Sequence, residues 1–191
     1  YSADYFADYP PGYILVLGLV SLVRKALQLS YESRWTYFLL ALIPAICDCA
    51  AVVLLDHISR RYMGQGRAQR CLVLFAAFCP LTLFDTGIWK QIDGAFALPL
   101  LLCFWLLEER RYLLAAVLYG VALAIKPQAL LFGPVLAVCF LVAIADAVRD
   151  GKSPLKSVGQ IFGGAALALL PPLLAGLPFY GAKNLVPSLI D

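Results

Sequence analysis

The chain has 191 residues, of which 62% are hydrophobic and 14% are charged, and its formal net charge is +3. Soluble domains usually carry about 25% charged residues, so this composition excludes an ordinary soluble domain. The apolar residues form long blocks separated by short basic stretches, which is typical of a helical protein that crosses a membrane several times. The basic residues therefore indicate orientation in a bilayer, and we expect membrane lipids as partners and no nucleic acid.

The first segment, residues 1–34, opens with polar and aromatic residues and contains the sequence D-Y-P-P at residues 8–11. Two consecutive prolines fix two φ angles and push the residues before them away from helical angles. Asp8 is therefore expected on a stiff, non-helical stretch, with Asp4 four residues earlier. Rigid placement is what a catalytic carboxylate requires. The alternative is that both are solvated acids in a loop.

The apolar block at residues 11–29 contains Arg24 and Lys25, a basic pair that suits a helix lying on the membrane surface. If residues 1–34 stay on one side, the basic stretches 56–70, 108–111 and 149–156 all fall on the opposite side. These stretches hold nine of the 15 Lys and Arg residues. The positive-inside rule makes that side cytoplasmic, which places residues 1–34 on the outer face.

Six later blocks are candidates for membrane spans: 35–55, 69–84, 93–107, 112–125, 129–148 and 158–178. A perpendicular span needs roughly 20 residues, so we expect the short blocks 93–107 and 112–125 to be broken or to stop short of full depth. The predicted fold is all-α, a polytopic transmembrane bundle of about six spanning helices with an outer interfacial helix. It forms a single domain with an outer loop at 1–34, spans within 35–178 and an outer segment at 179–191.

Asp48 lies in the middle of the first spanning block, with Pro44 one turn earlier. An ionised Asp there costs about 2.5–3.5 kcal/mol on insertion scales, so it needs a partner or a proton. A structural hydrogen bond between helices and a direct functional role both fit this residue. Pro44 is expected to bend the helix beside it.

The polar stretch D-T-G-I-W-K-Q-I-D covers residues 85–93 between two apolar blocks. The indole of Trp89 could stack on a sugar or anchor the loop at the membrane interface, and Gln91 adds hydrogen-bonding capacity. Asp93 opens the next apolar block, so a role as the N-cap of a helix is as natural for it as a functional role in this polar stretch.

Lys126 stands between two apolar runs, in the sequence L-A-I-K-P-Q-A-L-L at residues 123–131. Pro127 should break the helix there and free backbone groups that lipid cannot satisfy. A cation at such a break is a natural phosphate ligand, and Gln128 can add hydrogen bonds. The alternative is a tight outer turn whose lysine reaches toward the interface.

Taken in order, the D-Y-P-P stretch, the intramembrane Asp, W-K-Q-I-D and K-P-Q resemble bacterial multi-spanning glycosyltransferases of the GT-C superfamily. The D-Y-P-P stretch is also similar to that of the lipid-linked-oligosaccharide glucosyltransferases of the endoplasmic reticulum. The resemblance covers most of residues 4–135, and the remainder matches only in hydropathy. It implies inverting transfer of a hexose from a polyprenyl-phosphate donor to a hydroxyl of a glycan, lipid or protein, on the outer face of a bacterial plasma membrane.

The resemblance also implies roles for particular residues. Asp8 is the candidate general base, with Asp4 as the second candidate, and a divalent metal such as Mg²⁺ or Mn²⁺ could bind through this pair. Lys126 and Gln128 are candidates for holding the donor phosphate. The candidates for the substrate cavity are Tyr9, Trp89, Gln91 and Asp93.

Members of this group have a spanning helix before the first outer loop, so the sequence is expected to be an internal fragment of a longer protein. The main alternative function is a multi-spanning transporter or flippase for a lipid-linked or anionic substrate. It would explain Asp48 and the proline break at Lys126. A transporter should show an internal repeat, and the two halves of this sequence show none.

Overall fold

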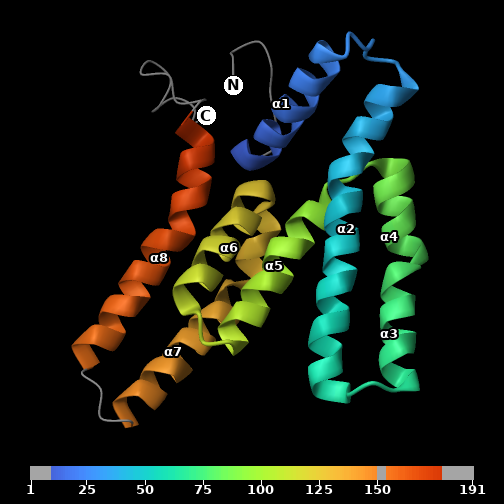
Figure 1. Ribbon diagram of the computed structural model, residues 1–191. Helices are drawn as coiled ribbons and strands as arrows, with labels where there is room; N and C mark the ends of the chain where they lie inside the picture. Colours follow the sequence, from blue (N-terminus) through green and yellow to red (C-terminus); the bar gives the residue numbers. More distant parts are fainter. Residues whose placement is uncertain (1–9, 150–153, 178–191) are drawn as a thin grey trace.

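The computed structural model describes residues 10–149 and 154–177, and in these ranges it contains helices and no strand (Figure 1). The elements are α1 (Pro11–Ala26), α2 (Arg34–Met63), α3 (Arg67–Ala77), α4 (Pro80–Phe84), the π-helical turn η1 (Asp85–Trp89), α5 (Asp93–Glu108), α6 (Tyr112–Ile125), the 3-10 helix η2 (Pro127–Phe132), α7 (Gly133–Arg149) and α8 (Pro154–Gly176). The predicted all-α class is confirmed.

Three helical runs are long and apolar enough to cross a membrane: Arg34–Met63, Arg67–Trp89 and Pro127–Asp146. The chain is therefore a helical membrane protein. α5 and α6 have 16 and 14 residues. At 1.5 Å per residue they span about 24 and 21 Å, less than the roughly 30 Å of a bilayer core. They are the short pair expected from the sequence.

The helix connections lie at two opposite ends of the bundle (Figure 1). One end, which we call the α1 end, holds α1, η1 and the turn from α6 into η2. The other, which we call the hairpin end, holds the α2–α3 connection, the α5–α6 connection and the facing ends of α7 and α8. This separation matches the division of outer and basic segments made from the sequence. Which end faces the cytoplasm stays a prediction.

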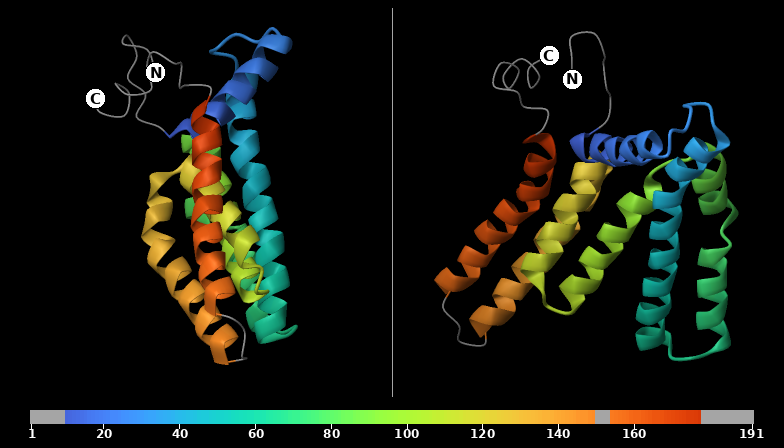
Figure 2. Two further views of the ribbon diagram at one scale, coloured as in Figure 1. Left: turned by 90° about the vertical axis from the view of Figure 1, so that its left-hand side faces the viewer. Right: turned by 45° about the horizontal axis from the view of Figure 1, so that its top comes forward.

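α1 crosses the α1 end at an angle to the helices beneath it (Figure 2). Pro10 is its N-cap and Pro11 its first residue, a position where the missing N–H of proline costs nothing. A Cβ on Gly12 would overlap the carbonyl oxygen of Ala124 and stand 2.7 Å from its carbonyl carbon. Glycine therefore lets the start of α1 sit on the last turn of α6.

Arg24 plays a structural part at the other end of α1. It is buried, its Nη1 donates a hydrogen bond to the carbonyl oxygen of Leu29 at 2.9 Å, and its guanidinium lies 3.6 Å from the ring centre of Tyr31. The basic pair that suggested an interfacial helix thus includes one arginine that secures the turn into α2. The surface location of α1 stays a prediction.

Two boundaries differ from those expected. The block at 69–84 is not one helix, because α3 ends at Ala77 and α4 begins at Pro80, whose ring disfavours helical angles in the residue before it. α2 runs on to Met63, beyond the expected end at residue 55, and passes through Pro44 without ending. Arg60 and Arg61 lie in its last turn, where positive charge favours the helix dipole.

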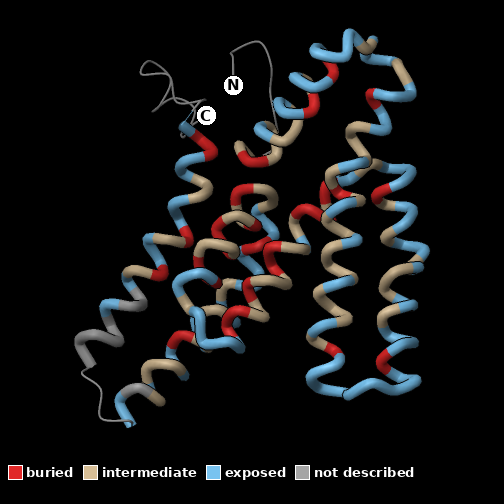
Figure 3. The backbone as a smooth tube through the Cα atoms, viewed as in Figure 1, coloured by how far each residue is buried: buried red, intermediate tan, exposed pale blue. Residues whose placement is uncertain are grey.

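The core lies among α5, α6, α7 and α8. Ala115, Ala116 and Ala122 of α6 are almost completely buried, and a Cβ on Gly120 would overlap the carbonyl oxygen of Ala168 in α8. Such small residues let helices approach closely in a membrane. Figure 3 shows the buried positions gathered on α5 and α6, whereas α2 and α3 are mainly intermediate or exposed. Because few residues of α2 and α3 are buried, a groove can form on this side of the bundle.

Candidate functional site

Lys126 lies at the break between α6 and η2, at the α1 end. Its backbone is extended, with φ −141° and ψ 129°, because Pro127 disfavours helical angles in the residue before it. Its N–H still donates to the carbonyl oxygen of Ala122 at 2.9 Å, and its own carbonyl accepts from Ala129 at 3.2 Å. The helix break predicted from the sequence is confirmed, and it places Lys126 at the α1 end of the bundle.

The Nζ of Lys126 forms an ion pair with Oδ1 of Asp93, 33 residues earlier in the chain. The lysine side chain is 19% exposed and the aspartate 48% exposed, so the pair is partly open to solvent. Asp93 is the first residue of α5, whereas the N-cap is Ile92 and makes no side-chain cap. The N-cap role considered for Asp93 is therefore wrong, although a carboxylate in the first turn still favours the helix dipole.

Asp48 has a partner in the π-helical turn η1. The hydroxyl of Thr86, which is buried, donates a hydrogen bond to Oδ2 of Asp48 at 2.6 Å. This bond joins α2 to the polar stretch 85–93. The predicted hydrogen bond between helices is present, and it meets the need of an intramembrane carboxyl for a partner.

Gly94 brings the start of α5 against α2. A Cβ at this position would overlap Oδ1 of Asp48 and stand 2.7 Å from the carbonyl oxygen of Pro44.

The side chain of Asp85 interacts electrostatically with Asp93, Lys126 and Asp48. We call Asp48, Asp85, Asp93 and Lys126 the acid–lysine cluster. It combines three carboxyl groups with one ammonium group.

Sequence reasoning missed Asp85, Thr86 and Gly94. Asp85 and Thr86 open the same polar stretch as Trp89, and Gly94 directly follows Asp93. The position of Asp85 and Thr86 in that stretch is a signal that could have included these two residues, whereas Gly94 lies just outside it. Their contacts with α2 depend on the packing of distant segments and leave no local pattern.

Three other residues proposed for substrate binding lie at the α1 end but outside the cluster: Trp89, Gln91 and Gln128. Trp89 is 63% exposed, and its ring packs edge-on against Phe84 at 5.0 Å between centroids. Gln91 is exposed and donates its backbone N–H to the carbonyl oxygen of Asp85 at 3.1 Å. Gln128 is exposed in η2. The indole and both amides are thus open to a ligand.

Asp4, Asp8 and Tyr9 lie outside the described residues. Pro10 and Pro11, the last two residues of the D-Y-P-P stretch, are described, and Gly12 directly after them packs closely against Ala124 of α6. Ala124 is two residues before Lys126. The end of the D-Y-P-P stretch is therefore anchored beside the acid–lysine cluster.

A groove of about 790 Å³ lies between α2, α5 and the run from α3 to η1. Its walls are mostly apolar, with Val52, Leu55, Phe75, Leu83 and Leu101 among them, and Asp48 and Thr86 supply polar atoms. Ala97 and Leu101 line it from α5, four and eight residues after Asp93. Residues four apart share one face of a helix, so the groove runs from the cluster along α5.

No group of three or more His, Cys, Asp or Glu side chains within the described ranges is arranged to hold a metal ion. The two acids considered for a divalent cation, Asp4 and Asp8, are outside these ranges.

Gly94→Ala is expected to destabilise the protein by about 1–3 kcal/mol, the usual cost of overpacking, because the new methyl group must displace Asp48 or the α2 backbone. Gly18→Ala is a matched control, since nothing lies within 4 Å of a Cβ there. Thermal unfolding in detergent measures both. Equal midpoints for the two variants would mean that α5 does not pack on α2 at Asp48.

Comparison with known families gives one finding. The model of glycosyltransferase family 87 matches residues 6–185. No curated protein and no solved structure matches the chain. The matched range contains Asp8, the acid–lysine cluster and the groove. The match to a glycosyltransferase family favours an enzyme over the transporter that the sequence analysis considered.

Proposed function

The chain belongs to glycosyltransferase family 87, and from this premise we propose that it moves a hexose from a polyprenyl-phosphate donor to an acceptor hydroxyl with inversion. The reaction takes place at the α1 end, which we assign to the outer face of a bacterial plasma membrane. The helical bundle is proposed to be of the GT-C type, and the acceptor is a glycan, a lipid or a protein.

The observation that carries this proposal is the meeting of three distant segments at the α1 end. Gly12, after the two prolines, packs on the last turn of α6. Asp93, at the end of the W-K-Q-I-D stretch, pairs with Lys126 of the K-P-Q stretch. Segments separated by tens of residues thus bring the residue after the two prolines, a polar loop and a cation to the α1 end, an arrangement that suits a two-substrate reaction.

Lys126 is suited to the phosphate that leaves the sugar. An ammonium group has three donors, so the pair with Asp93 leaves N–H groups for phosphate oxygens while it fixes the position of Nζ. Negative charge grows on the phosphate as the glycosidic bond breaks, and a fixed cation there lowers the barrier. Gln128, exposed two residues later, can donate to the same oxygens.

Asp8 is the proposed general base, with Asp4 as the second candidate. It takes the proton of the acceptor hydroxyl, whose oxygen then attacks the anomeric carbon on the face opposite the phosphate. The bond between carbon and phosphate oxygen breaks, and the configuration inverts. Tyr9, Trp89 and Gln91 would contact the sugars, and a divalent Mg²⁺ or Mn²⁺, if the reaction uses one, would be held by Asp4 and Asp8.

The groove along α5 supports a lipid-linked donor. Its apolar walls suit an isoprenoid chain, and its Asp48 end adjoins Gly94, the residue after Asp93. Along α2, lining residues run from Ala45 to Leu55, about 15 Å at 1.5 Å per residue. A donor could thus place its phosphate at Lys126 and its first isoprene units in the groove.

Ala97→Phe tests this assignment, because the ring would fill the groove near the cluster. We expect KM for a long-chain polyprenyl-phosphate hexose to rise about tenfold, equivalent to about 1.4 kcal/mol of binding. The matched control is Ala137→Phe, at an exposed position of α7 outside the groove, which should leave KM within about twofold. Equal KM values for the two variants would contradict a lipid chain in the groove.

A further inference from the structure

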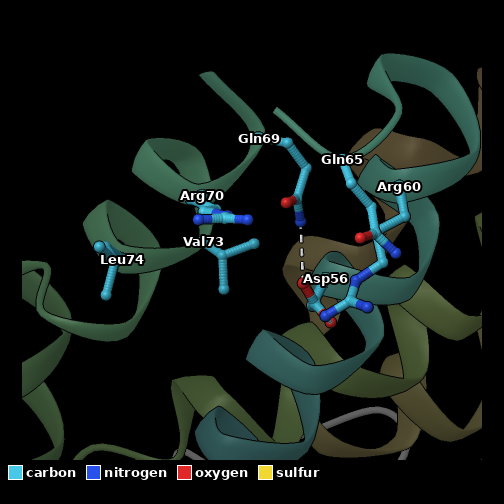
Figure 4. Close-up of a pocket in the computed structure, with 7 residues that line it drawn as sticks. All are labelled: Asp56, Arg60, Gln65, Gln69, Arg70, Val73 and Leu74. Atoms are coloured by element: carbon cyan, nitrogen blue, oxygen red, sulfur yellow. Dashed lines mark hydrogen bonds and ion pairs between the residues drawn. The ribbon is translucent and has the colours of Figure 1, made fainter. Parts of the chain in front are cut away.

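A second pocket is lined by residues around the α2–α3 connection (Figure 4). This connection lies at the hairpin end of the bundle, opposite the α1 end (Figure 1). It has a volume of about 330 Å³ and is formed by α2, the α2–α3 connection and α3. Its lining residues are Asp56, Arg60, Gln65, Gln69, Arg70, Val73 and Leu74. Pockets that bind small molecules usually have about 300–1,000 Å³, so this one can hold a compact group.

The polar floor of the pocket is fixed by hydrogen bonds. Gln69 is 3% exposed, and its Nε2 donates to Oδ1 of Asp56 at 2.8 Å and to Oγ of Ser59 at 3.1 Å. Asp56 also forms an ion pair with Arg60 at 2.7 Å. Figure 4 shows Gln69 pointing toward Asp56, with Arg60 close to the same carboxylate. The negative charge of Asp56 is therefore already matched within the floor.

The remaining charge in the pocket is positive. Arg70 lines it from α3 and forms no ion pair with any described residue. A guanidinium without an ion-pair partner that lines a pocket favours an anion with several oxygens, such as a phosphate.

One side of the pocket is apolar, and this apolar surface continues along α3. Val73 and Leu74 line it, and Leu74 is 56% exposed. α3 belongs to a run that is long and apolar enough to span the membrane. A ligand that combines a phosphate with a hydrocarbon chain fits a positively charged pocket that borders an apolar helix surface.

From this geometry we infer that the pocket binds the phosphate of an anionic phospholipid headgroup, with the acyl chain along α3. The site is separate from sugar transfer and does not depend on the proposed function. Loose attraction of basic residues to the membrane surface is the competing explanation. It predicts no difference between arginines that line the pocket and arginines that do not.

The test uses purified protein in nanodiscs of equal parts phosphatidylglycerol and phosphatidylcholine, with retained lipid counted by native mass spectrometry. We expect phosphatidylglycerol to be retained preferentially and Arg70→Gln to lower its occupancy about tenfold. Arg67→Gln, the same change three residues earlier on α3 and outside the pocket, should change it less than about twofold. Arg70→Lys should keep most of the binding, because it keeps the charge.

Equal losses in Arg70→Gln and Arg67→Gln would overturn the pocket in favour of diffuse surface charge. Equal retention of the two lipids by the wild type would overturn the preference for an anionic headgroup. A parallel titration with inorganic phosphate separates the two sources of the anion. If phosphate binds to the protein in lipid-free detergent and phosphatidylglycerol does not compete, the ligand is a soluble phosphate and the lipid assignment is wrong.

Discussion

Lys126→Met should lower kcat for sugar transfer by about a hundredfold to a thousandfold, the usual loss when one group that stabilises a developing negative charge is removed. Methionine keeps the length of the side chain but offers no N–H group to the phosphate. Single-turnover measurements with a polyprenyl-phosphate hexose would give the chemical step directly.

Lys90→Met is the matched control for this prediction. Lys90 is also at the α1 end, but its Nζ donates to the carbonyl oxygen of Ile88 at 3.2 Å and lies 5.2 Å from the ring centre of Tyr37. Its replacement should leave kcat within about threefold. Similar losses in both variants would mean that general positive charge, and not a placed ammonium group, assists the reaction.

Asp8→Asn should lower kcat by about a hundredfold to ten-thousandfold, the range for loss of a general base. Asparagine has nearly the same shape but cannot accept a proton, so binding of the donor should change little. Asp4→Asn is the comparison, because it makes the same change four residues earlier. A large loss in Asp4→Asn with an active Asp8→Asn would transfer the role of base to Asp4.

Much of the fold follows from local patterns. The long apolar block around α2 and the short blocks of α5 and α6 are readable as helices, and Pro127 predicts the end of α6 at Lys126. The grouping of basic segments at one end follows from the positive-inside rule. These features depend on hydrophobic length, proline and charge, all of which act over a few residues.

The arrangement of the candidate site could not be read from the sequence. The pair between Asp93 and Lys126 and the bond between Thr86 and Asp48 join residues 33 and 38 positions apart. Asp93 looked equally suited to an N-cap, and the helix start at Asp93 itself decides against it. Gly94 gave no signal of its own, because its importance comes from α2 lying against it. Such contacts are set by tertiary packing.

Sugar transfer by membranes that contain this protein is the measurement to make first. The substrates are a panel of polyprenyl-phosphate hexoses and the corresponding nucleotide sugars, with the anomeric configuration of the product determined by NMR. We predict transfer from a polyprenyl-phosphate donor with inversion and none from a nucleotide sugar. Transfer from nucleotide sugars alone, or movement of the lipid-linked sugar across the membrane without a new glycosidic bond, would contradict the proposed function.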